Sequence, residues 1–190
     1  MRLLNFIILV VSCGGCIAGA QDTNIINLYT KLEGFEAQTG KTIIKAWSQV
    51  GTVSAKTAII SVSYRESTEV VTGFKEHGVV IGIKEENLEE YRTVLDYDEL
   101  ESFLEAVDFM LKVDMTVTSL PSFQAVHRTR ADLRLLAYNS TRRVGIVHAL
   151  ETSYNTAGNR ILLAPDQLGE FKVLMRSAKE KLDGLKKAGA

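Results

Sequence analysis

A pattern of twelve residues occurs twice in this chain, and it limits the folds that the chain can adopt. Segments 92–103 and 160–171 align without a gap at an offset of 68 residues, and Arg, Leu, Asp, Leu and Phe are identical at five positions. This offset is too long for a solenoid repeat and suits a small supersecondary unit that is used twice. We therefore expect two tandem copies of one unit.

Each copy ends in a segment with the apolar periodicity of an amphipathic helix. The apolar stripe of the first helix consists of Leu100, Phe103, Leu104, Val107, Met110 and Leu111. That of the second consists of Leu168, Phe171, Leu174, Met175, Ala178 and Leu182. Asp96 and Glu99 have the spacing of a capping box, and Pro165 suits the first position of a helix.

Upstream of each helix, β-branched and aromatic residues indicate strands. The expected strands are residues 42–50, 58–64, 70–75 and 79–84 in the first copy, and 123–130, 133–138 and 143–151 in the second. Ile60, Val62 and Tyr64 share one face of their strand. Residues 76–78 contain a glycine and are predicted to form a hairpin turn.

The predicted fold class is α+β, with two tandem pseudo-repeats, each an antiparallel β-sheet followed by a packed C-terminal helix. The expected boundaries are a signal peptide at 1–20, an N-terminal segment at 21–40, a first module at 41–113, a second module at 123–185 and a frayed tail at 186–190. A short helix is expected within the N-terminal segment. This arrangement resembles the Whirly and PC4-type single-stranded nucleic-acid binders at the level of fold analogy only, because no motif of those families is matched.

The first twenty residues have the features of an export signal. Met1-Arg2 precedes the apolar run 3–11, and Ala18-Gly19-Ala20 resembles a cleavage site, so the mature chain is expected to begin at Gln21. The run is too short for a permanent transmembrane anchor. A second interpretation is that Val10-Val11-Ser12-Cys13 is a lipobox and that Cys13 carries a lipid anchor. The expected location is therefore secreted or periplasmic, with an anchored lipoprotein as the alternative.

Composition argues against several classes of function. A net charge of −1 does not favour a chain that coats nucleic acid or membrane as a whole. The three histidines, His77, His127 and His148, have no metal-binding spacing, and no nucleophile elbow or phosphate loop is present. We expect His77 to lie in a turn and His148 to face the packed side of a sheet. No catalytic, cofactor-binding or metal-binding residue is assigned, and no cofactor is expected.

Basic residues cluster in the second half of the chain. Strand alternation and proximity in sequence place them with one aromatic residue on a common surface that would bind an anion or an acidic partner. The candidate binding residues are Arg128, Arg130, Arg134, Tyr138, Arg142 and Arg143.

The leading hypothesis is an exported, non-enzymatic domain that binds an unidentified protein or envelope component. The second is binding of single-stranded nucleic acid or another polyanion through the basic surface, which would weaken steeply with salt. The third is a hydrolase without a recognisable motif.

Overall fold

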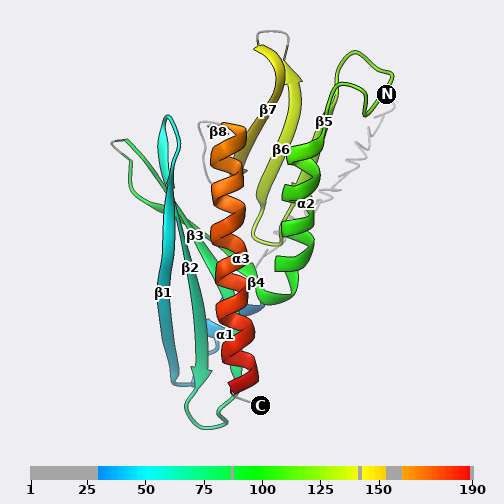
Figure 1. Ribbon diagram of the computed structural model, residues 1–190. Coiled ribbons are helices and arrows are strands. Elements are labelled where there is room, and N and C mark those ends of the chain that lie inside the picture. The colour runs from blue at the N-terminus through cyan, green and yellow to red at the C-terminus, as the bar shows by residue number, and fades with distance from the viewer. Residues whose placement is uncertain (1–29, 87, 141–142, 153–159, 189–190) are drawn as a thin grey trace, which may run out of the picture.

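The protein is an α+β structure built from two four-stranded antiparallel sheets and three helices in the described part of the chain (Figure 1). The computed structural model describes residues 30–86, 88–140, 143–152 and 160–188. The predicted signal peptide, Cys13 and most of the N-terminal segment lie outside these residues. Among the described helices, none is both long and apolar enough to span a membrane.

The first sheet has the strand order β1-β2-β3-β4, and every neighbouring pair is antiparallel. Its strands are β1 (Ile43–Ser54), β2 (Ala58–Glu69), β3 (Lys75–Glu85) and β4 (Tyr91–Asp96). A single 3₁₀ turn, Tyr97–Glu99, connects β4 to helix α2 (Leu100–Lys112). The Glu99 carboxylate accepts a hydrogen bond from the Asp96 backbone N–H at 3.2 Å, which is one half of the predicted capping box.

The second sheet repeats this order as β5-β6-β7-β8 and is also followed by a helix. Its elements are β5 (Gln124–Arg128), β6 (Leu133–Ser140), β7 (Arg143–Thr152), β8 (Ile161–Leu163) and helix α3 (Pro165–Ala188). Helix α3 thus includes residues 186–188 of the predicted frayed tail, whose remaining residues lie outside the described part.

The predicted hairpin turn at residues 76–78 is wrong, because β3 runs through them without a break. The turn lies at residues 70–74 instead, so the strand predicted at residues 70–75 is wrong as well. There Gly73 adopts φ of 69°, the Gly73 N–H donates to Glu69 O at 2.9 Å, and the Thr72 hydroxyl donates to the Glu69 carboxylate. Gly78 serves close packing instead, since a Cβ there would lie 2.7 Å from Leu95 O.

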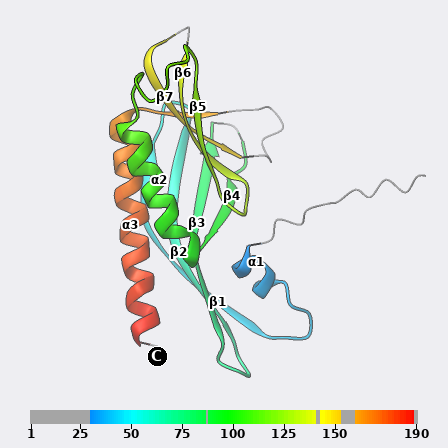
Figure 2. The same cartoon turned by 90° about the vertical axis from the view of Figure 1, so that its right-hand side faces the viewer.

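Helices α2 and α3 lie side by side on one side of the strands and pack against each other (Figure 2). Each packs mainly on the sheet that belongs to the other half of the chain. Helix α3 lies against β1, β2 and β3, and a Cβ at Gly51 on β1 would lie 2.7 Å from Leu174 Cδ2. Helix α2 lies against β5 and β6, and Phe103 meets the His127 ring edge-on at 5.7 Å.

One hydrophobic core therefore joins both sheets. Leu100 and Leu168, the equivalent leucines of the repeated pattern, are both fully buried in it. The equivalent phenylalanines, Phe103 and Phe171, meet edge to face with ring centroids 6.1 Å apart. The predicted apolar stripes of both helices and the buried face of Ile60 and Val62 are confirmed.

Helix α1 (Lys31–Glu36) covers the opposite face of the first sheet, near β3 and β4 (Figure 2). Thr30 and Glu33 form a capping box, in which the Glu33 N–H donates to Thr30 Oγ1 at 3.1 Å. Leu32 packs with Val80 and Val94 in a small second core. The expectation of a short helix on the first sheet is therefore confirmed.

Truncation of Phe171 tests the shared core. We expect Phe171→Ala to lower the free energy of unfolding by about 3–5 kcal/mol, because it empties a fully buried site between the helices. Val173→Ala, at an exposed site two residues away on α3, is the matched control and should change it by less than about 0.5 kcal/mol. Urea denaturation measures both variants, and a cost below about 1 kcal/mol for Phe171→Ala would contradict the shared core.

Candidate functional site

Arg130, one of the predicted binding residues, is held by carboxylates of the first half of the chain. Its Nη1 lies 3.0 Å from Asp96 Oδ2 and 2.8 Å from Asp98 Oδ1, and its Nη2 lies 2.8 Å from Asp98 Oδ2. The Arg130 backbone N–H also donates to Glu99 Oε1 at 2.8 Å. These hydrogen bonds hold the pKa of Asp98 well below its ordinary value and raise that of Arg130. Arg130 therefore connects the β5–β6 turn to the start of α2.

Arg128 and Arg134 are also paired with carboxylates. Both bind Asp132, which is buried and adopts φ of 57° in the β5–β6 turn. Arg134 Nη1 lies 3.1 Å from Glu151 Oε1, and Glu151 also accepts a hydrogen bond from Arg160 Nε at 2.7 Å. The bonds with Asp132 raise the pKa of Arg134. The guanidinium groups of Arg128, Arg134 and Arg160 thus share the two carboxylates of Asp132 and Glu151.

The remaining predicted binding residues do not complete a basic surface in the described part of the chain. Tyr138 lies under the Arg160 guanidinium, whose carbon is 5.3 Å from the ring centroid. Arg142 lies outside the described residues, and Arg143 is described only as the first residue of β7. The structure thus brings Arg128 and Arg134 together through Asp132 and separates Arg130 from them by its bonds to Asp96 and Asp98.

Asp96 is a buried junction that sequence reasoning did not identify as such. Its side chain is only 2% exposed. It accepts hydrogen bonds from the backbone N–H groups of Lys31 at 2.8 Å and Leu32 at 3.0 Å, which begin α1. With Arg130 on its other side, Asp96 holds three elements together: α1, the end of β4 and the β5–β6 turn. A carboxylate at a helix N-terminus is favoured by the free N–H groups and by the helix dipole.

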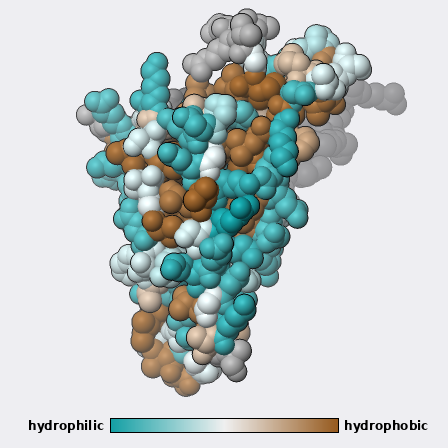
Figure 3. All heavy atoms as spheres, in the orientation of Figure 1, coloured by the Kyte–Doolittle hydropathy of each residue, from teal (hydrophilic) through white to brown (hydrophobic). Residues whose placement is uncertain are grey.

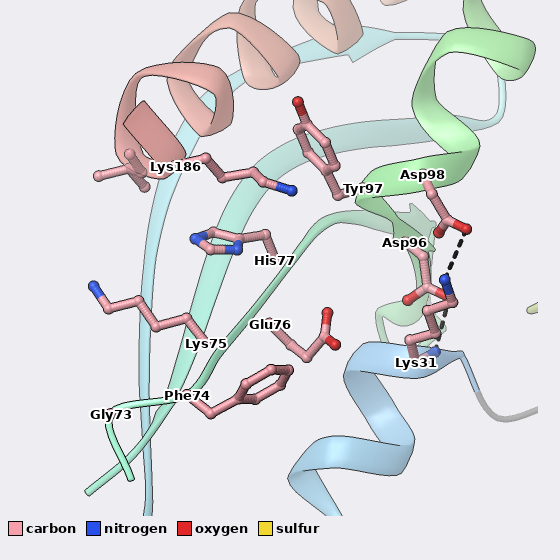
Figure 4. Close-up of a pocket in the computed structure, with 11 residues that line it drawn as sticks. Lys31, Gly73, Phe74, Lys75, Glu76, His77, Asp96, Tyr97, Asp98 and Lys186 are labelled. Atoms are coloured by element: carbon pink, nitrogen blue, oxygen red, sulfur yellow. Dashed lines mark hydrogen bonds and ion pairs between the residues drawn. The ribbon is translucent and has the colours of Figure 1, made fainter. Parts of the chain in front are cut away.

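A cavity of about 530 Å³ lies next to this junction, beside the start of β3 (Figure 4). Residues 73–77, at the end of the β2–β3 turn and the start of β3, form one wall. Residues 96–98 and Lys31 lie across the cavity, and Leu185 and Lys186 near the end of α3 close another side. The volume lies within the range of roughly 300–1,000 Å³ that is typical of ligand pockets.

His77 lines this cavity from strand β3, not from the turn in which it was predicted. Its Nε2 lies 3.1 Å from Glu66 Oε2, and Lys75 Nζ lies 3.0 Å from Glu66 Oε1. Burial alone would raise the pKa of Glu66, but the hydrogen bonds with Lys75 and His77 lower it below its ordinary value. The three side chains form a polar cluster on the face of the sheet that α3 covers.

Tyr97 lines another part of the cavity. Its hydroxyl donates to the Asp183 carboxylate on α3, and this bond raises the pKa of Tyr97 and lowers that of Asp183. Lys186 Nζ lies 3.9 Å from the centroid of the Tyr97 ring, within the range of a cation–π contact. Figure 4 shows the Lys186 amine directed toward Tyr97, beside His77.

Large apolar side chains are exposed at the same end of the first sheet. They are Ile44, Trp47, Val70, Val71 and Phe74, and we call them the apolar end. Val71 is 87% exposed and Trp47 is 67% exposed. Figure 3 shows hydrophobic residues gathered at the lower tip of the molecule. By the register of β1 and β2, Trp47 lies on the face toward α1 and Ile44 on the opposite face, so the exposed apolar side chains border both faces of this end. Exposed apolar surface is typical of a site that contacts another molecule.

The other histidines have structural surroundings. His148 is buried, as predicted, and its Nε2 lies 2.9 Å from Met110 O on α2. Burial lowers the pKa of His127, which packs against Phe103. Among the described residues, no group of three or more His, Cys, Asp or Glu side chains is placed to hold a metal ion.

No protein-family model, curated protein or solved structure matches this chain. The described residues form an α+β protein of two antiparallel sheets, with a cavity and an apolar end on the first sheet.

The ion pairs of Arg130 make the stability of the fold depend on pH. The pKa of Asp98 is lowered in the folded state, so this contribution to stability is present above about pH 4 and is lost as the pH falls toward the folded-state pKa. We expect wild-type stability to fall more steeply than that of Arg130→Met between about pH 5 and pH 2. Urea denaturation across this range measures both.

Arg92→Met is the matched control, because Arg92 pairs with Glu90 at an exposed position. The stability of Arg92→Met should depend on pH in the same way as that of the wild type. Parallel curves for the wild type and Arg130→Met would show that Arg130 does not depress the pKa of Asp98.

Proposed function

We propose that this protein is an exported, non-enzymatic binding module and that it holds a protein or envelope partner at the apolar end of the first sheet. The observation that carries this proposal is the exposure of Ile44, Trp47, Val70, Val71 and Phe74 at one end of the molecule, beside the cavity. Burial of exposed apolar surface is favourable at about 25 cal/mol per Å². Export is supported by the leader-like sequence of residues 1–20.

We further propose that the two halves are tandem copies of one ancestral unit. Three observations support this: the shared strand order, the five identities at the offset of 68 residues, and the contact between Phe103 and Phe171. A contact between equivalent residues is the signature of a two-fold relationship. The resemblance to Whirly and PC4-type binders remains a proposal about fold.

Polyanion binding through the basic residues is the second alternative, and it has less support. Arg128, Arg130 and Arg134 are already paired with carboxylates, so an anionic ligand would have to displace those partners. Hydrolysis is the third alternative, and an activity screen with and without a chelator tests it.

A charge placed on the apolar end tests the proposed function. We expect Val71→Asp to reduce partner capture from the native envelope and extracellular fractions by about tenfold or more, because it places a charge where apolar surface would be buried. Val173→Asp is the matched control, since Val173 is also exposed, at 65%, but lies on α3. Capture is measured by quantitative mass spectrometry of the retained proteins.

Equal capture by wild type, Val71→Asp and Val173→Asp would refute the apolar end as the binding surface. Thermal unfolding of each variant establishes that a loss of capture does not come from a loss of folding.

A further inference from the structure

Strand β3 has a free edge beside the cavity. It spans Lys75–Glu85, but β4 pairs with it only from Gly78 to Ile83. Toward the β2–β3 turn, residues 75–77 pair with β2 on one side and with no described strand on the other. A free edge presents unpaired backbone groups that another chain can use.

The direction of these backbone groups follows from the ladder between β2 and β3. Glu69 N donates to Phe74 O at 2.9 Å, which places Glu69 and Phe74 at a hydrogen-bonded position of the ladder, although the Phe74 N–H itself donates to Thr72 Oγ1 in the turn. Such pairs alternate with non-hydrogen-bonded pairs along an antiparallel ladder. Lys75 and His77 belong to the second kind, and their backbone N–H and C=O groups therefore point away from β2.

The cavity lies where these groups point. Gly73–His77 line one wall, and Lys31, Asp96 and Asp98 lie across from them (Figure 4). The line of β4 ends at this position, because the chain turns at Asp96 into the 3₁₀ turn. A strand placed in the cavity would therefore pair with β3 on the same edge as β4, beyond the point where β4 ends.

The two faces of this free edge differ in charge. On the face toward α3 lie Lys75 and His77, which are both bonded to Glu66, and Lys186, with which no described carboxylate forms an ion pair. On the face toward α1, Phe74 packs against Phe35 and remains about half exposed, and Glu76 lies beside it. The first face attracts an acidic side chain, and the second favours an apolar one.

We propose that an extended segment of a partner protein, with alternating acidic and apolar side chains, adds to the free edge of β3 as an extra strand. Its backbone hydrogen-bonds to Lys75 and His77, its acidic side chains face Lys186, and its apolar side chains pack on Phe74. Strand addition is an established mode of peptide recognition, in which the backbone supplies affinity and alternate side chains supply specificity. This inference rests on the proposed function and specifies how the partner is held.

The test uses the full chain and an acetylated, amidated peptide of alternating glutamate and valine. Lys75→Pro removes the outward N–H but none of the bonds to β2, and proline is tolerated at a free edge. Lys75→Ala is the matched control, because it removes the same charge and keeps the N–H. We expect the peptide to bind the wild type, to bind Lys75→Ala a few-fold more weakly, and to bind Lys75→Pro at least about tenfold more weakly.

Binding is measured by amide chemical shifts and by hydrogen exchange, and the bound peptide should slow exchange at Lys75 and His77. Lys186→Glu should weaken the binding of the peptide of alternating glutamate and valine. The same variant should strengthen the binding of a peptide of alternating lysine and valine. Equal affinity of Lys75→Pro and Lys75→Ala would overturn strand addition, as would the absence of binding below about 1 mM. If free glutamate displaced the labelled peptide as effectively as unlabelled peptide does, the cavity would be a site for small anions instead.

The two proposals fail in different ways. If Val71→Asp abolishes partner capture and Lys75→Pro does not, the binding module stands and strand addition is wrong. If neither variant changes capture, the proposed function itself fails.

Discussion

The structure depends on the packing of each helix against the sheet of the other half. The apolar face of the first sheet, with Val53, Ile60 and Val62, is covered by α3, which is the last element of the chain. At Gly51 the absence of a side chain lets Leu174 approach the backbone of β1. Because the hydrophobic effect is the dominant favourable contribution to folding, neither sheet buries its apolar face without the other half of the chain.

Asp96 and Arg130 reinforce this arrangement at one corner. Asp96 satisfies the first N–H groups of α1 and receives Arg130 from the second half, so one buried carboxylate positions elements that are far apart in sequence. The same corner is where β4 ends, and it leaves the start of β3 open beside the cavity. The junction that stabilises the fold thus also shapes the end of the sheet to which we assign partner binding.

Local patterns predicted the secondary structure better than the site. The stripes from Leu100 and Leu168 identified both helices, because helical periodicity is a property of a single segment. The turn at residues 76–78 was misplaced, because a glycine needed for packing against Leu95 resembles a turn glycine in sequence. Arg130 was interpreted as part of a free surface, because its partners Asp96 and Asp98 lie more than thirty residues away in sequence. Arg128 and Arg134 pair with Asp132, which lies within four residues of each, so their pairing had a local signal that the interpretation did not use. Which helix covers which sheet is a long-range property, and no local pattern contains it.

Hydrogen exchange in the variant Met175→Ala tests the shared core most directly. Met175 is fully buried on α3, and its truncation costs about 2–5 kcal/mol. The exchange of peptic fragments from the full chain is compared with that of the wild type. If α3 stabilises the first sheet, fragments from β1, β2 and β3 lose protection together with α3 itself. A loss of protection confined to residues 123–188 would contradict the shared core.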